Sequence, residues 1–167
     1  MRVIIVRPFA EDDLAAAIEG ISSRTPDQHR RRLAEHQRGT GFTELIAWLD
    51  GIAVGFVGLG FHDDASIDEM LESRGFALVY DLHVEEPHRR QGVGSALMRA
   101  LEDRARALGA PGVILDTGTN ESFAPARALY RSLGYIDRGG VYLGGWSDPD
   151  RPGVHFVDQL TTWLKLF

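Results

Sequence analysis

The sequence predicts an α/β fold in which a β-hairpin is followed by strands that alternate with helices. Asp50-Gly51 joins two strand-like segments, 42–50 and 52–61, and this dipeptide suits the positive φ angles of a tight hairpin turn. Further along the chain, segments with strand and helix patterns alternate, at 76–84, 92–108, 112–117 and 125–133. Such alternation predicts a right-handed crossover and a sheet that is locally parallel.

The N-terminal part begins with a strand and an amphipathic helix. Residues 2–7 are rich in Val and Ile and predict a buried strand that ends at Pro8. The helix that follows has its apolar residues on one face, namely Leu14, Ala17, Ile18 and Ile21.

A second, polar helix is predicted to start at Thr25. The segment Thr25-Pro26-Asp27-Gln28 combines a capping box with proline at the first helical position. Residues 30–32 are three consecutive arginines on this helix, whose side chains point about 100° apart. We therefore expect them to form a solvated face.

Two further segments are less regular. Residues 62–74 carry five acidic side chains and no basic one before Arg74, so they are either an attractor for a cationic substrate or a plain soluble connection. Residues 156–167 fit a last strand, with a helix as the alternative.

Composition narrows the class of protein. A length of 167 residues favours one domain, 1–167, in which 138–167 would be a divergent C-terminal extension of the sheet. The 18 basic and 24 acidic residues give a net charge of −6, which disfavours nucleic-acid binding and allows a cationic substrate. The chain has no cysteine and no long apolar stretch. We expect a cytoplasmic protein with no metal and no membrane partner.

The most informative segment is residues 88–95, between a strand and a helix. Gly92 and Gly94 let the backbone approach a ligand closely, and the exposed amides of a first helical turn attract phosphate oxygens. Arg89 and Arg90 add positive charge. The segment therefore predicts an anion site.

Three interpretations of this turn compete with one another. A phosphate-binding loop of the NTPase kind needs Gly-Lys-Ser/Thr, which is absent. A dinucleotide fingerprint is closer, because Asp116 follows Gly94 at a suitable distance, but Leu97 occupies the place of the third glycine. An ordinary glycine-rich helix start is the third.

Residues 88–95 resemble motif A of the GCN5-related N-acetyltransferase (GNAT) superfamily, whose pattern Arg/Gln-x-x-Gly-x-Gly/Ala is matched by Arg89, Gly92 and Gly94. Residues 126–135 look like the family's motif B, and the resemblance covers about residues 3–136. It implies a GNAT-like fold: a central mixed, mostly antiparallel twisted sheet with a locally parallel, splayed strand pair, flanked by about four helices.

The resemblance also implies a cosubstrate, acetyl-CoA, whose pyrophosphate binds at the turn and whose pantetheine arm follows the preceding strand. The residues that would bind it are Leu82, His83, Val84, Arg89, Arg90, Gln91, Gly92, Val93, Gly94, Ser95 and Tyr130. Phe123 stands where the family often has Asn, so Asn120 is either a further contact or the cap of a turn.

Catalysis of amine acetylation needs a base, because a lysine-like amine is almost wholly protonated at pH 7. Asp81, His83 and Glu85 alternate along 76–85 and are expected on one strand face, with Tyr80, Leu82 and Val84 on the other. The segment resembles the aminoglycoside 3-N-acetyltransferase branch, which favours Asp81 as the base over Glu85 and His83.

The departing thiolate needs a proton, and Tyr130 matches the tyrosine that supplies it in the family. A core aromatic residue on an amphipathic helix is the alternative. The sequence thus predicts an N-acetyltransferase acting on a small-molecule or peptide amine that is cationic. A non-catalytic acyl-CoA-binding module and a dinucleotide-binding domain are the other candidates, and Trp146 and Trp163 are candidate contacts of a homodimer.

Overall fold

The computed structural model describes residues 2–39, 41–61, 75–148 and 150–167. The chain forms two compact parts, Met1–Val113 with Phe167, and Ile114–Leu166. The expected acidic segment 62–74 lies outside the described residues. That the two parts form one domain stays a prediction.

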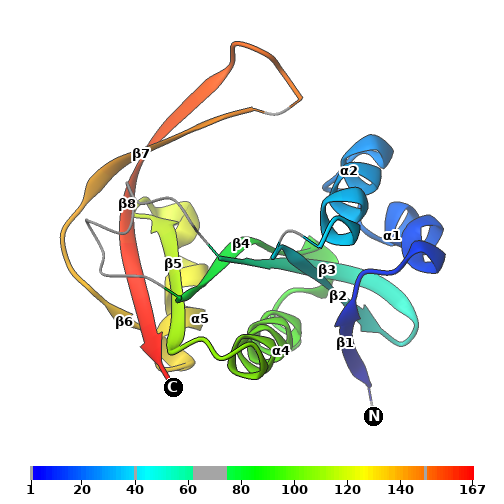
Figure 1. The fold of residues 1–167 in the computed structure, drawn as a ribbon, viewed down its shortest axis with the longest axis horizontal. Helices are drawn as coiled ribbons and strands as arrows, with labels where there is room; N and C mark the ends of the chain where they lie inside the picture. Colours follow the sequence, from blue (N-terminus) through cyan, green and yellow to red (C-terminus); the bar gives the residue numbers. More distant parts are fainter. Residues whose placement is uncertain (1, 40, 62–74, 149) are drawn as a thin grey trace. The chain divides into compact units, whose positions relative to one another are not determined.

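The first part contains an antiparallel sheet with the strand order β1-β2-β3-β4 (Figure 1). Its strands are β1 (Ile4–Pro8), β2 (Thr43–Leu49), β3 (Ile52–Gly60) and β4 (Ala77–Val84). Asp50 and Gly51 have φ angles of 50° and 85°, so the predicted hairpin turn between β2 and β3 is confirmed.

Helices cover both faces of this sheet (Figure 1). The short helix η1 (Glu11–Asp13) leads into α1 (Leu14–Gly20), and α2 (Pro26–Gln37) follows. Apolar residues of α1 and α2 pack with Trp48 and Phe56 in one buried cluster. On the other face, α4 (Val93–Ala107) approaches β3, where a Cβ on Gly55 would lie 3.4 Å from Leu97. The short helix η2 (Glu86–His88) connects β4 to the turn before α4.

The predicted capping box of α2 is present. Gln28 N donates to Thr25 Oγ1 at 3.2 Å, and Thr25 N donates to Gln28 Oε1 at 2.7 Å. Pro26 occupies the first turn, where its missing amide hydrogen costs nothing.

We expect Thr25→Ala to lower the free energy of unfolding by about 1 kcal/mol, because one amide of the first turn loses its acceptor. Chemical denaturation would measure the loss. Thr25→Ser is the matched control, since its hydroxyl keeps the cap, and an equal loss in both variants would contradict the role of the hydroxyl.

A β-bulge in β4 corrects the expected face assignment of this strand. Gly58 pairs with Tyr80 and Phe56 with His83, so three steps along β4 match two steps along β3. Asp81, with φ of 48°, takes up the extra residue. Because Gly58 and Phe56 share one face of β3, Tyr80 lies on the same face as His83, and simple alternation was wrong for Tyr80.

The second part contains β5 (Gly112–Gly118, whose first two residues belong to the first part), α5 (Ala124–Ser132) and three further strands. The short helix η3 (Glu121–Phe123) precedes α5. The long strand β8 (His155–Leu166) pairs antiparallel with β6 (Ile136–Asp137) and with β7 (Tyr142–Ser147). The prediction of a last strand rather than a helix is therefore confirmed.

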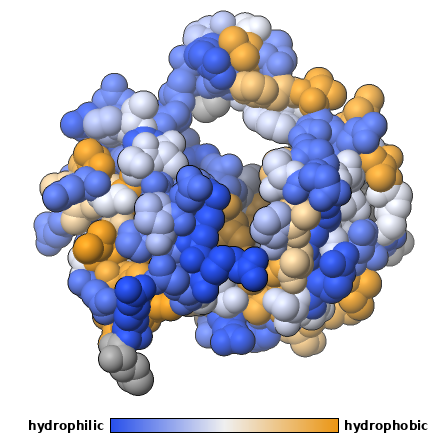
Figure 2. All heavy atoms as spheres, turned by 180° about the vertical axis from the view of Figure 1, so that it is seen from behind, coloured by the Kyte–Doolittle hydropathy of each residue, from blue (hydrophilic) through white to orange (hydrophobic). Residues whose placement is uncertain are grey.

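Apolar side chains are distributed unevenly in this second part. Trp163 is only 1% exposed, so it belongs to the core and is wrong as a candidate for a dimer contact. Trp146 is 50% exposed and stacks on Phe156. Figure 2 shows polar and apolar residues interspersed over the face seen from behind. Among the described residues, no helix has the length and apolar character that crossing a membrane requires.

Candidate functional site

The turn before α4 has the geometry of an anion site. Gly92 is the N-cap in the left-handed region, with φ of 86°, and Arg90 has φ of 62°. No side chain of the described residues caps this helix, and its first turn contains no acidic residue. The first amides of a helix have no intrahelical acceptor and carry the positive end of its dipole. A phosphate therefore finds donors without having to displace a competing carboxylate.

The side chains of the turn hold its shape. Gln91 Nε2 donates to the carbonyl of Pro87 at 3.0 Å, and the Arg2 guanidinium donates to Gln91 Oε1. Arg89 Nε donates to the carbonyl of Val84 at 2.9 Å, which ties the turn to the end of β4. Arg89 and Arg90 are both exposed.

Asp81, the favoured base, is held by two arginines. Its Oδ2 accepts a hydrogen bond from Arg32 Nη2 and lies 3.9 Å from Arg24 Nη2. Arg32 also donates to Glu35 at 2.9 Å, and its side chain is only 27% exposed. The expected solvated face is thus wrong for Arg32, which connects α2 to β4.

A buried ion pair between Arg24 and Glu44 was missed by sequence reasoning. Both side chains are at least nine-tenths buried, and the guanidinium donates to Glu44 Oε1. Burial lowers the pKa of Arg24 and raises that of Glu44, and the attraction between the two charges does not fully offset it. The sequence did contain a signal that Glu44 is buried, because its spacing from Ile46 and Trp48 places it on the same inward face of β2.

His83 and Glu85 lie together, as expected. His83 Nε2 is 3.3 Å from Glu85 Oε1, and the imidazole stacks on Phe56 with centroids 5.4 Å apart. Glu85 accepts hydrogen bonds from Ser22 Oγ at 3.0 Å and from Ser23 N at 3.1 Å. Burial favours a higher pKa for Glu85, but the hydrogen bonds from Ser23 and Ser22 outweigh it and leave the pKa lowered.

Tyr130 and Asn120 belong to the second part. Tyr130, on α5, is 6% exposed and packs near Tyr135 and Trp163. Burial raises the pKa of Tyr130 to about 12, so the phenol keeps its proton at neutral pH. Asn120 Oδ1 accepts from Ser122 N at 3.0 Å, so its side chain caps η3.

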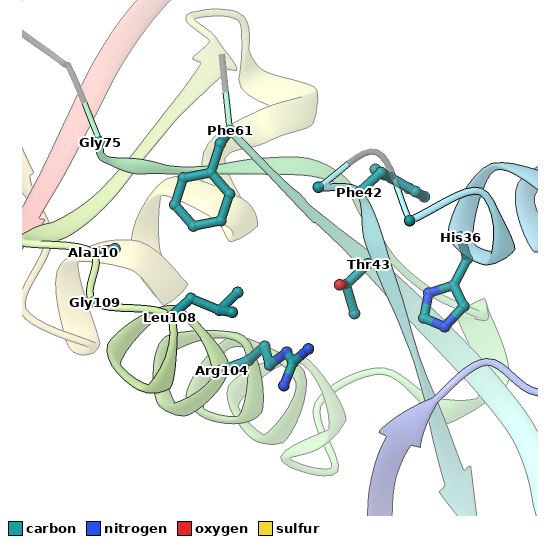
Figure 3. A pocket seen from close by; sticks show the side chains of 11 residues that line it. His36, Phe42, Thr43, Phe61, Gly75, Arg104, Leu108, Gly109 and Ala110 are labelled. Atoms are coloured by element: carbon teal, nitrogen blue, oxygen red, sulfur yellow. The ribbon is translucent and has the colours of Figure 1, made fainter. Parts of the chain in front are cut away.

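A cavity of about 630 Å³ lies at the C-terminal end of α4, away from the turn. Figure 3 shows Arg104 of α4 and Leu108, which follows the helix, at its edge, with Phe61, Thr43 and His36 around it. The cavity was not expected from the sequence, and it contains none of the expected site residues.

A model of the Acetyltransferase (GNAT) family matches residues 9–135. The chain belongs to this family. The dinucleotide-binding alternative is thereby overturned.

Sequence relatives agree with the family. The chain is 35% identical to human N-acetyltransferase 8 over 125 residues, which are 74% of this chain and 51% of that protein. It is 37% identical over 65 residues to an IAA acetyltransferase of Azospirillum brasilense, covering 39% of this chain and 41% of that protein. This GNAT chain thus spans about half the length, or less, of these curated relatives.

Solved structures agree on the fold. An N-acetyltransferase from Staphylococcus aureus Mu50 superposes with a TM-score of 0.72 at 14% identity, over 98% of each chain. A putative acetyltransferase from Salmonella typhimurium, solved with its cofactor acetyl-CoA, gives a TM-score of 0.67 at 17% identity, over 98% of this chain and 93% of that one. The predicted GNAT-like α/β fold is confirmed.

Proposed function

We propose that this GNAT chain is an N-acetyltransferase that moves an acetyl group from acetyl-CoA to a primary amine by direct attack. The observation that carries the proposal is the uncapped N-terminus of α4 behind Gly92. This turn offers backbone donors, no acidic side chain and two exposed arginines, which is the chemistry that a pyrophosphate requires.

The residues proposed to hold acetyl-CoA come from this geometry for the pyrophosphate and from the likeness to the family for the pantetheine arm. The amides of residues 93–95 and the side chains of Arg89 and Arg90 would bind the pyrophosphate, and the backbone of residues 82–84 would bind the pantetheine arm. Among the described residues, a Cβ on Gly92 would meet only Ile4 Cδ1 within 4 Å, at 3.7 Å, so this part of the chain leaves room for a ligand at the turn. Asn120 is already used as a cap, and we assign it no contact.

The chemistry then needs two proton transfers by side chains of the chain. Bound acetyl-CoA supplies the acetyl thioester and its sulfur leaving group. A base on β4, drawn from Asp81, His83 and Glu85, takes the proton of the amine, and the Tyr130 hydroxyl gives its proton to the sulfur. The phenol of Tyr130 is protonated at neutral pH, as a general acid must be, because burial raises its pKa to about 12.

The acceptor is proposed to be a cationic small molecule or a peptide amine, in keeping with the net charge of −6. A panel of spermidine, tobramycin, a peptide with a free N-terminal alanine and an acetylated peptide with one internal lysine samples this class. Release of free CoA with at least one of them supports transfer. Binding of acetyl-CoA without release from any of them favours the alternative, a non-catalytic acyl-CoA-binding module.

Acetyl-CoA should also stabilise the protein. At a concentration of about a hundred times its dissociation constant, a ligand that binds only the folded state adds about 2.7 kcal/mol to the free energy of unfolding. Thermal melting with acetyl-CoA should therefore show a clear upward shift, and NAD should give little. A shift with NAD and none with acetyl-CoA would contradict the proposed function.

A further inference from the structure

The imidazole of His83 is oriented by its neighbours on both sides. It stacks on Phe56, with an angle of 22° between the rings, and Nε2 faces the Glu85 carboxylate. A carboxylate with a lowered pKa only accepts hydrogen bonds at neutral pH, so the hydrogen must be on Nε2. Nδ1 then carries the lone pair, and none of the described residues hydrogen-bonds to it.

Glu85 is itself fixed in place. Ser22 Oγ and Ser23 N occupy its two oxygens, and both belong to the segment between α1 and α2. The side chain of Glu85 is 12% exposed, whereas that of His83 is 30% exposed. Of the two, the imidazole is the group that a substrate reaches.

We propose that His83 is the general base of this acetyltransferase and that Glu85 is the residue that positions it. The proposal rests on the proposed function. His83 Nδ1 takes the proton that the ammonium group of the substrate loses, and the neutral amine nitrogen then forms its bond to the acetyl carbon. The carbon–sulfur bond breaks, and the sulfur takes the proton of Tyr130. The second proton that the nitrogen loses passes through water to the Tyr130 oxygen, and exchange with water returns the proton on His83 to solvent.

Asp81 is less suited to this role. Its Oδ2 is engaged by Arg32, with Arg24 nearby, and taking up a proton there would weaken these ion pairs. His83 has the opposite bias, because accepting a proton on Nδ1 strengthens its interaction with Glu85 through Nε2.

Burial keeps the imidazole of His83 neutral before reaction, and the charged groups around it act in both directions. Burial is the main cause that lowers the pKa of His83 below its ordinary value, and Arg89 and Arg24 lower it further. Glu85 acts the other way and raises it. The net pKa lies below the ordinary value, so the imidazole is deprotonated at neutral pH and available as a base.

His83→Gln is the first variant, because glutamine can still donate to Glu85 and cannot serve as the base. With the amine of the panel that releases most CoA, we expect turnover at pH 7 to fall at least about a hundredfold. The loss should shrink as the pH rises toward the pKa of the amine, which then arrives already deprotonated. His155→Gln, on β8 beside Ser147, is the matched control for loss of a histidine.

Glu85→Gln tests positioning. Without the carboxylate, the pKa of His83 should fall further, so the acidic limb of the kcat/KM profile should move to lower pH while kcat drops. The amine titrates identically in all variants, so any difference between profiles comes from the protein. A purely structural role for Glu85 would lower the melting temperature without moving this limb.

Three results would overturn the proposal. The first is His83→Gln within threefold of the wild type at pH 7 while it still melts normally and binds acetyl-CoA. The second is Asp81→Asn removing the acidic limb that His83→Gln leaves in place. The third result applies even if no amine releases CoA and the proposed function fails. Nitrogen NMR of the wild-type protein at pH 8 would then report which nitrogen of His83 carries the hydrogen. A hydrogen on Nδ1 contradicts the proposed pairing of His83 with Glu85.

Discussion

Tyr130→Phe should lower turnover by at least about a hundredfold while leaving the Michaelis constant for acetyl-CoA nearly unchanged. The variant loses one hydroxyl whose proposed role exists only as the sulfur departs, and general acid catalysis contributes about 10² to 10⁴ in rate. The ring stays, so the packing near Tyr135 and Trp163 should survive. Steady-state kinetics and a melting curve measure the two effects.

The alternative role for Tyr130 makes the opposite prediction. If the residue matters only for packing, the variant melts lower and keeps its turnover per folded molecule. A loss of less than tenfold with the fold intact would mean that product release hides the step. Single-turnover measurement of CoA release then decides, and an unchanged rate there contradicts the proton transfer from Tyr130.

Gly92→Asp should weaken acetyl-CoA binding about a hundredfold, or about 2.8 kcal/mol. The new carboxylate would stand at the N-cap of α4, where the pyrophosphate is proposed to bind. Two unit charges about 4 Å apart near a protein surface repel by about 4 kcal/mol, which is more than this loss requires. Isothermal titration of the folded variant measures the change in Kd.

Gly92→Asn is the matched control, because position 92 has a φ of 86°. Asn and Asp tolerate the left-handed region to a similar degree and have nearly the same shape, so the two variants share any backbone strain. The difference between them is the charge. Equal affinity for acetyl-CoA in both variants would remove the turn from the site.

Most of the fold could be predicted because its signals are local. The Asp50-Gly51 turn and the Thr25 capping box each act within a few residues, and each lies where the sequence predicts it. The proposed anion site shares this property, since the turn and the helix start are consecutive in the chain. The family and its fold were predicted from this turn together with residues 126–135.

The arrangement around the candidate base could not be predicted, because it depends on residues far apart in the chain. Asp81 meets Arg32 across 49 positions and Glu85 meets Ser22 across 63. The faces expected for β4 assumed strict alternation, and the bulge breaks it at Asp81. Which of the three candidate bases is free to react thus follows from tertiary contacts that no local pattern encodes.

The extra residue at the bulge of β4 can be considered for deletion. If position 81 were deleted, Tyr80 and His83 could keep their partners Gly58 and Phe56 in a regular ladder, with Leu82 opposite Val57. The pairing of β3 with β4 therefore does not require this residue. A shortened strand would lose the contact between Asp81 and Arg32 of α2, while the imidazole of His83 would stay opposite Phe56. Anyone who redesigns the site can therefore change the length of β4 at position 81 separately from the identity of the side chains that face the substrate.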